Sequence, residues 1–158
     1  MPLYYLTEHD VMTVLAATGQ EVQVRDFGLL SSAVARPRAS AFGEDAYPDP
    51  WVKAAALLHS LTRNHPFVDG NKRAGWNSAW TFIEVNAIGR LAGDFDVDAA
   101  ERFVLDVASG GMDDLTLISA GLQTFSGSQR DTAAGIPSPA GGDLGGIPLR
   151  FGLDPHAT

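Results

Sequence analysis

The stretch HPFVDGNKRAGW, residues 65–76, gathers polar and charged side chains around Gly70. This glycine suits a tight turn, because a residue without a Cβ adopts positive φ at little cost. Apolar residues at helical spacing follow, with Trp76, Trp80 and Ile83 on one face, so the sequence predicts a helix directly after the turn. The polar groups therefore collect where one helix ends and the next begins.

Helical periodicity continues on both sides of this corner. The segment WVKAAALLHSLTRNH, residues 51–65, places small and apolar side chains on one face. Residues 39–50 hold Gly43 and two prolines, which indicate a loop or an extended flap. No convincing strand is predicted between residues 4 and 125, so we expect an all-α fold, a compact bundle of about six helices. The helix caps expected elsewhere are Thr7, Asp26, Asp96 and either Asp113 or Asp114.

Length, charge and composition narrow the class of protein. A chain of 158 residues suits one domain, and its formal net charge of −8 disfavours non-specific binding to nucleic acid or to an anionic membrane. The absence of cysteine excludes disulfides and cysteine-based zinc sites. No apolar run reaches transmembrane length, and the first residues carry acids where a signal peptide would carry bases. We therefore expect a cytoplasmic protein with no membrane partner and no direct nucleic-acid partner.

The composition changes after Phe125. The last 33 residues contain seven glycines and four prolines, a share at which disorder is the expected state. We therefore divide the chain into a folded domain, residues 1–125, and a flexible Gly/Pro-rich tail, residues 126–158. Within the tail, alternate apolar residues could add to a sheet edge or lie in a groove: Ile147, Leu149, Phe151 and Leu153.

The start of the helix after Gly70 offers a site for an anion. The first N–H groups of a helix lack intrahelical acceptors, and the helix dipole adds positive potential at the same end. Lys72 and Arg73 add charge there, although cations at a helix N-terminus cost about 0.3–1 kcal/mol each. Arg63 lies one short loop away. A chain that accepts this cost is predicted to hold a specific small anion, and phosphate is the expected one.

Asp69 and His65 supply two further chemical groups. Asp69 suits a Mg²⁺ ligand, because magnesium in nucleotide sites combines few carboxylates with phosphate oxygens. The alternative is that Asp69 only caps the helix. His65 suits a general base, because imidazole titrates near neutral pH; the alternative is a structural histidine that closes its helix by bonding a carbonyl. His59, on another face of the same helix, is expected to be structural.

The motif HPFVDGNKR resembles the signature of the Fic/Doc superfamily, His-x-Phe-x-Asp/Glu-Gly/Ala-Asn-Gly/Lys-Arg. The segments VRDFGLLSSAVARP, FGEDAYPD, FIEVNAIG and VASGGMDDL are similar to segments of death-on-curing (Doc) type toxins, in the same order. The resemblance covers roughly residues 4–125. It implies the all-helical fold of that family, a catalytic role for the folded domain, and a target-aligning flap around residues 44–47.

The resemblance further implies an ATP-dependent protein kinase that halts translation. Doc-type toxins transfer the γ-phosphate of ATP, with Mg²⁺, to a threonine of elongation factor Tu, and a Phd-type antitoxin neutralises them. By position, His65 would take the proton of the threonine hydroxyl and Asp69 would hold Mg²⁺. Lys72 and Arg73 would stabilise charge on the transferred group. The residues implied to bind the nucleotide phosphates are Gly70, Asn71, Lys72 and Arg73, with smaller parts for Arg63 and Asn77.

Two positions distinguish the Doc type from AMP-transferring members of the superfamily. Those enzymes carry Gly where this chain has Lys72, and a second Arg where it has Trp76. The resemblance therefore favours phosphate transfer, and AMP transfer to a protein hydroxyl is the alternative. A second alternative is a catalytically silent module that only binds an antitoxin or another partner. The presence of the complete motif speaks against this alternative: His65, Asp69, Asn71 and Arg73.

Overall fold

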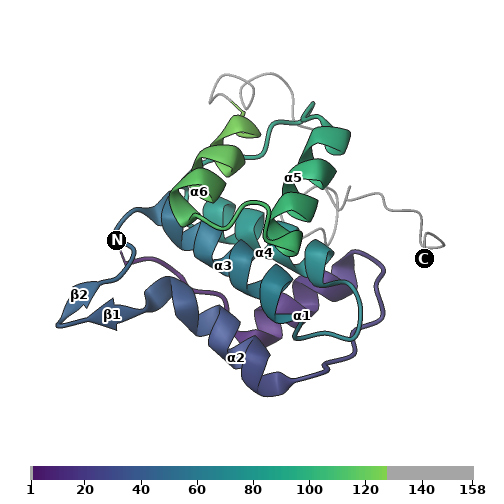
Figure 1. Ribbon diagram of the computed structural model, residues 1–158, viewed down its shortest axis with the longest axis horizontal. Coiled ribbons are helices and arrows are strands. Elements are labelled where there is room, and N and C mark those ends of the chain that lie inside the picture. Colours follow the sequence, from purple (N-terminus) through teal and green to yellow (C-terminus); the bar gives the residue numbers. More distant parts are fainter. Residues whose placement is uncertain (1, 128–158) are drawn as a thin grey trace.

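Helices α3 (Pro50–Asn64) and α4 (Asn71–Val85) lie at the centre of the bundle and form its largest helix–helix contact (Figure 1). The computed structural model describes residues 2–127. The other helices cover this central pair: α1 (Glu8–Ala17) and α2 (Phe27–Ala35) from one side, and α5 (Val97–Ser109) and α6 (Leu115–Thr124) from the other. The described residues thus confirm the predicted all-α bundle of six helices.

Side-chain caps explain where five of these helices begin. In each, a Thr or Asp side chain accepts a hydrogen bond from a backbone N–H of the first turn: Thr7, Asp26, Asp49, Asp96 and Asp114. Of the two candidates before α6, Asp114 is the cap, because it accepts from the N–H groups of Thr116 and Leu117. Helix α4 is different, since Gly70 precedes it and provides no side-chain cap.

Close packing between α3 and α4 accounts for a glycine inside a helix. Trp76 and Trp80 of α4 are almost wholly buried. The Trp76 ring centroid lies 5.8 Å from that of Trp80 and 5.4 Å from that of Phe125, in edge-on contacts. On the face toward α3, a Cβ at Gly75 would lie 2.7 Å from Thr62 Cγ2. Any larger residue at position 75 would therefore push the two central helices apart.

The prediction that residues 4–125 lack a strand is wrong at one place. Strands β1 (Ser40–Ala41) and β2 (Glu44–Asp45) pair as an antiparallel hairpin that projects from the bundle (Figure 1). Phe42 and Gly43 form its turn, with φ values of 54° and 80°. Two-residue hairpin turns need such positive φ values to match the twist of the strands. The segment predicted to be a flap is therefore a short hairpin.

A buried lysine attaches this hairpin to α3. Lys53 is only 1% exposed. Its Nζ donates to the Pro37 carbonyl and to the Asp45 carboxylate, both at 3.1 Å. It also lies 5.5 Å from the centroid of the Tyr5 ring. A buried ammonium group needs such partners, so the hairpin is held to the helix that leads into His65.

Hydrogen-bonded structure continues two residues past the boundary that composition suggests. Ser126 pairs with Leu91 in a single antiparallel bridge, and the Gly127 N–H donates to the Arg90 carbonyl at 2.8 Å. Residues 128–158, most of the predicted tail, lie outside the described residues, as do its alternating apolar positions Ile147, Leu149, Phe151 and Leu153. Among the described helices, none is both long and apolar enough to cross a membrane.

Candidate functional site

The loop between α3 and α4 forms a braced polar corner. His65 ends α3 in a left-handed conformation, with φ 50° and ψ 58°, and Gly70 precedes α4 with φ 83°. Phe67 is 1% exposed and anchors the loop in the core. The Asn71 Oδ1 accepts from the Phe67 N–H, and the Asn71 Nδ2 donates to the Phe67 carbonyl, both at 2.9 Å. The Asn71 side chain, predicted to bind phosphate, therefore braces the loop, and its backbone amide is left for an anion.

The N-terminus of α4 has the features of the predicted anion site. With no side-chain cap at Gly70, the first intrahelical bond joins the Ala74 N–H to the Gly70 carbonyl at 2.8 Å. The N–H groups of Asn71 and Lys72 have no acceptor among residues 2–127, as expected in a first helical turn. The Lys72 side chain is exposed and the Arg73 side chain is half-buried. Amides and two cations thus lie at the same helix end.

Arg25 fixes the backbone that carries His65. Its Nε donates to the His65 carbonyl at 2.7 Å and its Nη2 to the Asn64 carbonyl at 3.0 Å. The Pro66 carbonyl accepts from the N–H groups of Arg25 and Asp26, at 2.7 and 3.1 Å. Backbone geometry and Arg25 therefore close α3, and the His65 ring does not. The His65 side chain is exposed and makes no hydrogen bond with any described residue, which leaves its imidazole available to a substrate.

Asp69 and Arg73 meet a residue that the sequence did not single out. The Asp69 Oδ1 accepts from the Gly70 N–H at 2.8 Å, one residue too early for a bond that would cap the first turn of α4. Its Oδ2 lies 3.5 Å from the Gln20 Nε2. The Gln20 Oε1 accepts from the Arg73 Nη1 at 3.0 Å. Because Gln20 is about fifty residues away in sequence, no local pattern could have indicated it.

Two predicted phosphate ligands, Arg63 and Asn77, are engaged with backbone carbonyls in the structure. The Arg63 Nη1 donates to the Ala108 carbonyl at 3.3 Å and packs against Gly110, where a Cβ would lie 2.7 Å from it. Arg63 therefore closes the end of α5. Asn77 is 1% exposed, and its Nδ2 donates to the Arg73 carbonyl at 2.9 Å. Its side chain is therefore buried along α4.

His59 is a structural histidine, as predicted. The Arg36 Nη1 donates to His59 Nδ1 at 2.6 Å, so the proton of the neutral ring is on Nε2, which donates to the Asp113 Oδ1 at 2.7 Å. The hydrogen bond from His59 lowers the pKa of Asp113 below its ordinary value. Arg36 also donates to Ser60 Oγ at 2.9 Å. This network joins α3 to the loop before α6. It engages both ring nitrogens of His59 in hydrogen bonds within the protein.

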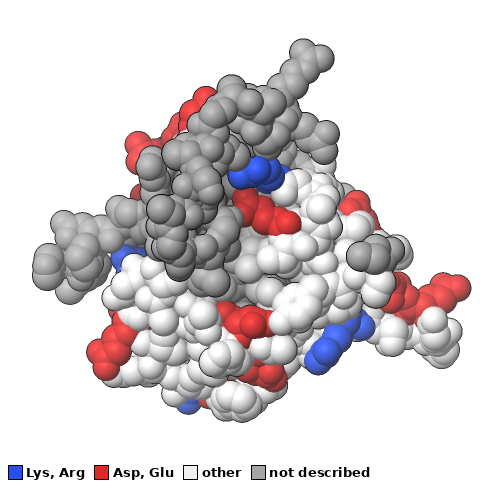
Figure 2. All heavy atoms as spheres, turned by 180° about the vertical axis from the view of Figure 1, so that it is seen from behind, with Lys and Arg blue, Asp and Glu red and all other residues white. Residues whose placement is uncertain are grey.

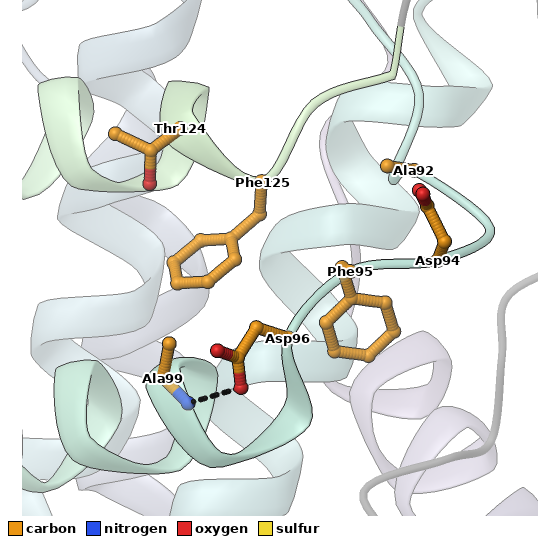
Figure 3. Close-up of a pocket in the computed structure, with 7 residues that line it drawn as sticks. All are labelled: Ala92, Asp94, Phe95, Asp96, Ala99, Thr124 and Phe125. Atoms are coloured by element: carbon orange, nitrogen blue, oxygen red, sulfur yellow. Dashed lines mark hydrogen bonds between the residues drawn. The ribbon is translucent and has the colours of Figure 1, made fainter.

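Two of the surface cavities bear on the candidate site. One of about 420 Å³ opens between the start of α5 and the end of α6 (Figure 3) and contains none of the predicted site residues. Its Asp96 carboxylate is engaged with the Ala99 N–H at 3.0 Å as the α5 cap. A second, of about 180 Å³, lies beside the polar corner and is lined by Gln20, Glu21, Gln23, Val68 and Asp69.

The surface charge and the available side-chain ligands limit which ions the polar corner can bind. Acidic side chains are scattered over the face shown in Figure 2, and the basic ones stand apart from one another. This distribution agrees with the net charge of −8. Within residues 2–127, no three His, Cys, Asp or Glu side chains gather as a metal cage. A divalent cation at Asp69 would therefore have to complete its coordination with other oxygens, such as those of water or phosphate.

Comparison with known proteins identifies a family whose model includes the polar corner. The family model described as "Fic/DOC family" matches residues 5–83, a range that includes α1 to α3, the loop between the two central helices and most of α4. A protein from Mycolicibacterium smegmatis named "Toxin Doc" is 54% identical over 122 residues, which are 77% of this chain and 92% of that protein.

Proposed function

We propose that this chain, which belongs to the Fic/Doc family, is the toxin of a toxin–antitoxin pair. The proposed activity is that of a protein kinase: transfer of the γ-phosphate of ATP to a threonine of a translation factor, expected to be elongation factor Tu. A relative named "Toxin Doc" that matches 77% of the chain supports the toxin assignment. The expected inhibitor is a Phd-type antitoxin.

The observation that carries the enzymatic proposal is the geometry at the start of α4. Among the described α-helices, α4 alone begins without a side-chain cap, and it adds Lys72 and Arg73 to its exposed amides. The exposed imidazole of His65 stands at the other end of the same loop. Phosphoryl transfer depends mainly on positioning and electrostatics, so amides and cations that hold phosphates beside a base form a sufficient set of groups.

The reaction assigns a separate task to each group. His65 accepts the proton of the threonine hydroxyl as its oxygen bonds to the γ-phosphorus. The bond between the γ-phosphorus and the oxygen that bridges it to the β-phosphorus breaks, and ADP leaves. The amides of Asn71 and Lys72, with the side chains of Lys72 and Arg73, hold the phosphates and stabilise the developing charge. Asp69 suits Mg²⁺, which when bound supplies further neutralisation of phosphate charge.

The environment of Trp76 supports phosphate transfer over AMP transfer. AMP-transferring members carry a second Arg at this position, as the resemblance implies. Trp76 is 1% exposed and its ring packs against Phe125 in the core. A wholly buried indole at this position offers no charged ligand to a phosphate. AMP transfer is the second candidate activity, favoured only by the family context.

Growth measurements test the proposal against a silent binding module. Expression of the chain should arrest growth, and His65→Ala should relieve the arrest because the hydroxyl loses its base. His9→Ala is a matched control, since His9 is an exposed histidine on α1. Circular dichroism of both variants checks that they fold. Arrest that persists in folded His65→Ala would mean that the chain acts by sequestering a partner.

A further inference from the structure

The geometry points to Gln20 as a positioning residue of this site, an inference that rests on the proposed function. We propose that its amide holds the Arg73 guanidinium toward the nucleotide phosphates and keeps it apart from Asp69. The Gln20 Oε1 accepts from the Arg73 Nη1 at 3.0 Å, and the Gln20 Nε2 faces the Asp69 Oδ2 at 3.5 Å. One neutral side chain thus stands between the proposed phosphate ligand and the proposed metal ligand.

The fold fixes the position of Gln20. Gly19, with φ 86°, turns the chain after α1, and Gln20 follows directly. A Cβ at Gly70 would lie 2.9 Å from the Gln20 Cγ and 3.0 Å from the Leu15 Cδ1. The stem of Gln20 therefore lies over the glycine that precedes α4. Its amide is held against the corner by packing, and it lines the cavity of about 180 Å³ beside Asp69.

The chemistry of the carboxamide matches this position. It offers an acceptor to a cation and a donor to an anion without carrying a net charge. A direct ion pair between Arg73 and Asp69 would use the guanidinium and the carboxylate on each other, leaving less of either for phosphate and Mg²⁺. A glutamate at position 20 would accept from Arg73 but would repel Asp69 and neutralise the arginine. The glutamine bonds each of the two groups without neutralising the charge of either.

Gln20→Met removes the amide but keeps an unbranched stem of similar length over Gly70. We expect ATP in the presence of Mg²⁺ to bind about tenfold more weakly, the loss of one hydrogen bond to a charged group. The melting temperature should stay near that of the unaltered protein. Gln23→Met is the matched control, because Gln23 lines the same cavity but its Nε2 donates to the Glu21 Oε1 at 3.0 Å.

A double-mutant cycle separates positioning from a general structural effect. If Gln20 acts through Arg73, adding Gln20→Met to Arg73→Met should weaken ATP binding no further. Gln20→Glu is a second single variant, expected to lose at least as much affinity as Gln20→Met, and it keeps the test sharp if the methionine variant does not fold. Isothermal titration calorimetry with ATP and Mg²⁺ measures each affinity on the full chain.

The outcomes separate this inference from the proposed function. Weak binding by Gln20→Met, normal binding by Gln23→Met and no further loss in the double variant would support the positioning role. Normal binding by folded Gln20→Met or Gln20→Glu would overturn it while leaving the proposed function standing. If Gln20→Met weakened ATP binding equally in the parent and in Arg73→Met, the positioning role would also be overturned. Failure of the unaltered protein to bind ATP with Mg²⁺ would overturn the proposed function and the role of Gln20 together.

Discussion

The Arg25 guanidinium donates to the carbonyls of Asn64 and His65, at the point where α3 runs out of intrahelical donors. Both bonds are charge-assisted and hold the residue proposed as the base. Arg25→Met should lower the free energy of unfolding by about 1–3 kcal/mol. It should also slow transfer, because the His65 backbone loses its brace.

Urea unfolding and initial transfer rates measure the two effects of Arg25→Met. Arg102→Met is the control, since Arg102 is exposed on α5. If Arg25→Met unfolds and reacts like that control, the brace at the end of α3 is without consequence.

Glu84 is a second residue whose environment affects stability, in this case in a pH-dependent way. Burial raises its pKa, although it accepts from the Leu91 N–H at 3.2 Å. A carboxyl group with a raised folded pKa destabilises the protein above that pKa, and this cost disappears below the ordinary pKa of glutamate. Glu84→Gln keeps an acceptor for Leu91 and should be more stable than the parent at pH 7. The gain in unfolding free energy should vanish near pH 4; a gain that is equal at both values would contradict the burial argument.

At the scale of elements, the contact between α3 and α4 determines whether replacing Gly75 raises or lowers the melting temperature. Helix propensity alone favours Gly75→Ala by about 1 kcal/mol. The new Cβ would lie 2.7 Å from the Cγ2 of Thr62, a buried β-branched residue whose side chain has little freedom. Gly75→Ala should therefore lower the melting temperature.

Thr62→Ser provides the matched test, because serine lacks Cγ2 but keeps an oxygen for the bond from Thr62 Oγ1 to the Leu58 carbonyl. Adding Thr62→Ser to Gly75→Ala should recover part of the lost stability, measured against Thr62→Ser alone. Equal melting temperatures of Gly75→Ala and the parent would contradict the expected loss, because they would mean that the contact with Thr62 costs no more than the gain in helix propensity, about 1 kcal/mol.

Elements were predictable where a local signal marks them. Thr7, Asp26 and Asp96 cap their helices as the sequence indicated, because a cap and its helix are adjacent in the chain. The hairpin was missed, because strands of two residues are too short to show alternation. Its attachment through Lys53 was equally invisible, since a lysine in a helix is usually exposed.

The candidate site was likewise predictable only where its residues are close together in the sequence. Residues 65–73 were predicted to form one polar corner, and the structure forms it, because they belong to a single loop and the helix turn after it. Arg25 and Gln20 reach it from 40 or more residues earlier in the chain, and such contacts leave no periodic trace. Asn77 was placed by its one-turn spacing from Arg73, but that spacing does not reveal that neighbouring helices bury its amide.

At the scale of the whole molecule, one network ties separate parts of the bundle together. The Asp113–His59–Arg36 contacts join the loop before α6, helix α3 and the segment after α2. The hydrogen bond from His59 lowers the pKa of Asp113, so Asp113 adds stability above the ordinary aspartate pKa. That stability is lost as the pH falls through the lowered folded pKa. Asp113→Asn should therefore melt at a lower temperature than the parent at pH 7, and the difference should shrink on acidification.

Thermal melts at pH 7 and pH 3 measure this difference between Asp113→Asn and the parent. Asp106→Asn, at an exposed aspartate of α5, controls for the change in net charge. A melting difference that persists unchanged at the lower pH would show that the carboxylate of Asp113 has no part in the network.

Transfer of label from ATP to elongation factor Tu distinguishes the proposed kinase activity from AMP transfer. The protein is incubated with Mg²⁺ and the factor, with ATP labelled at the γ-phosphate in one reaction and at the α-phosphate in another. We predict that a threonine of the factor is labelled from the γ position alone, and that this label is lost in folded His65→Ala. Label from the α position would identify AMP transfer and contradict the assignment made from Lys72 and Trp76.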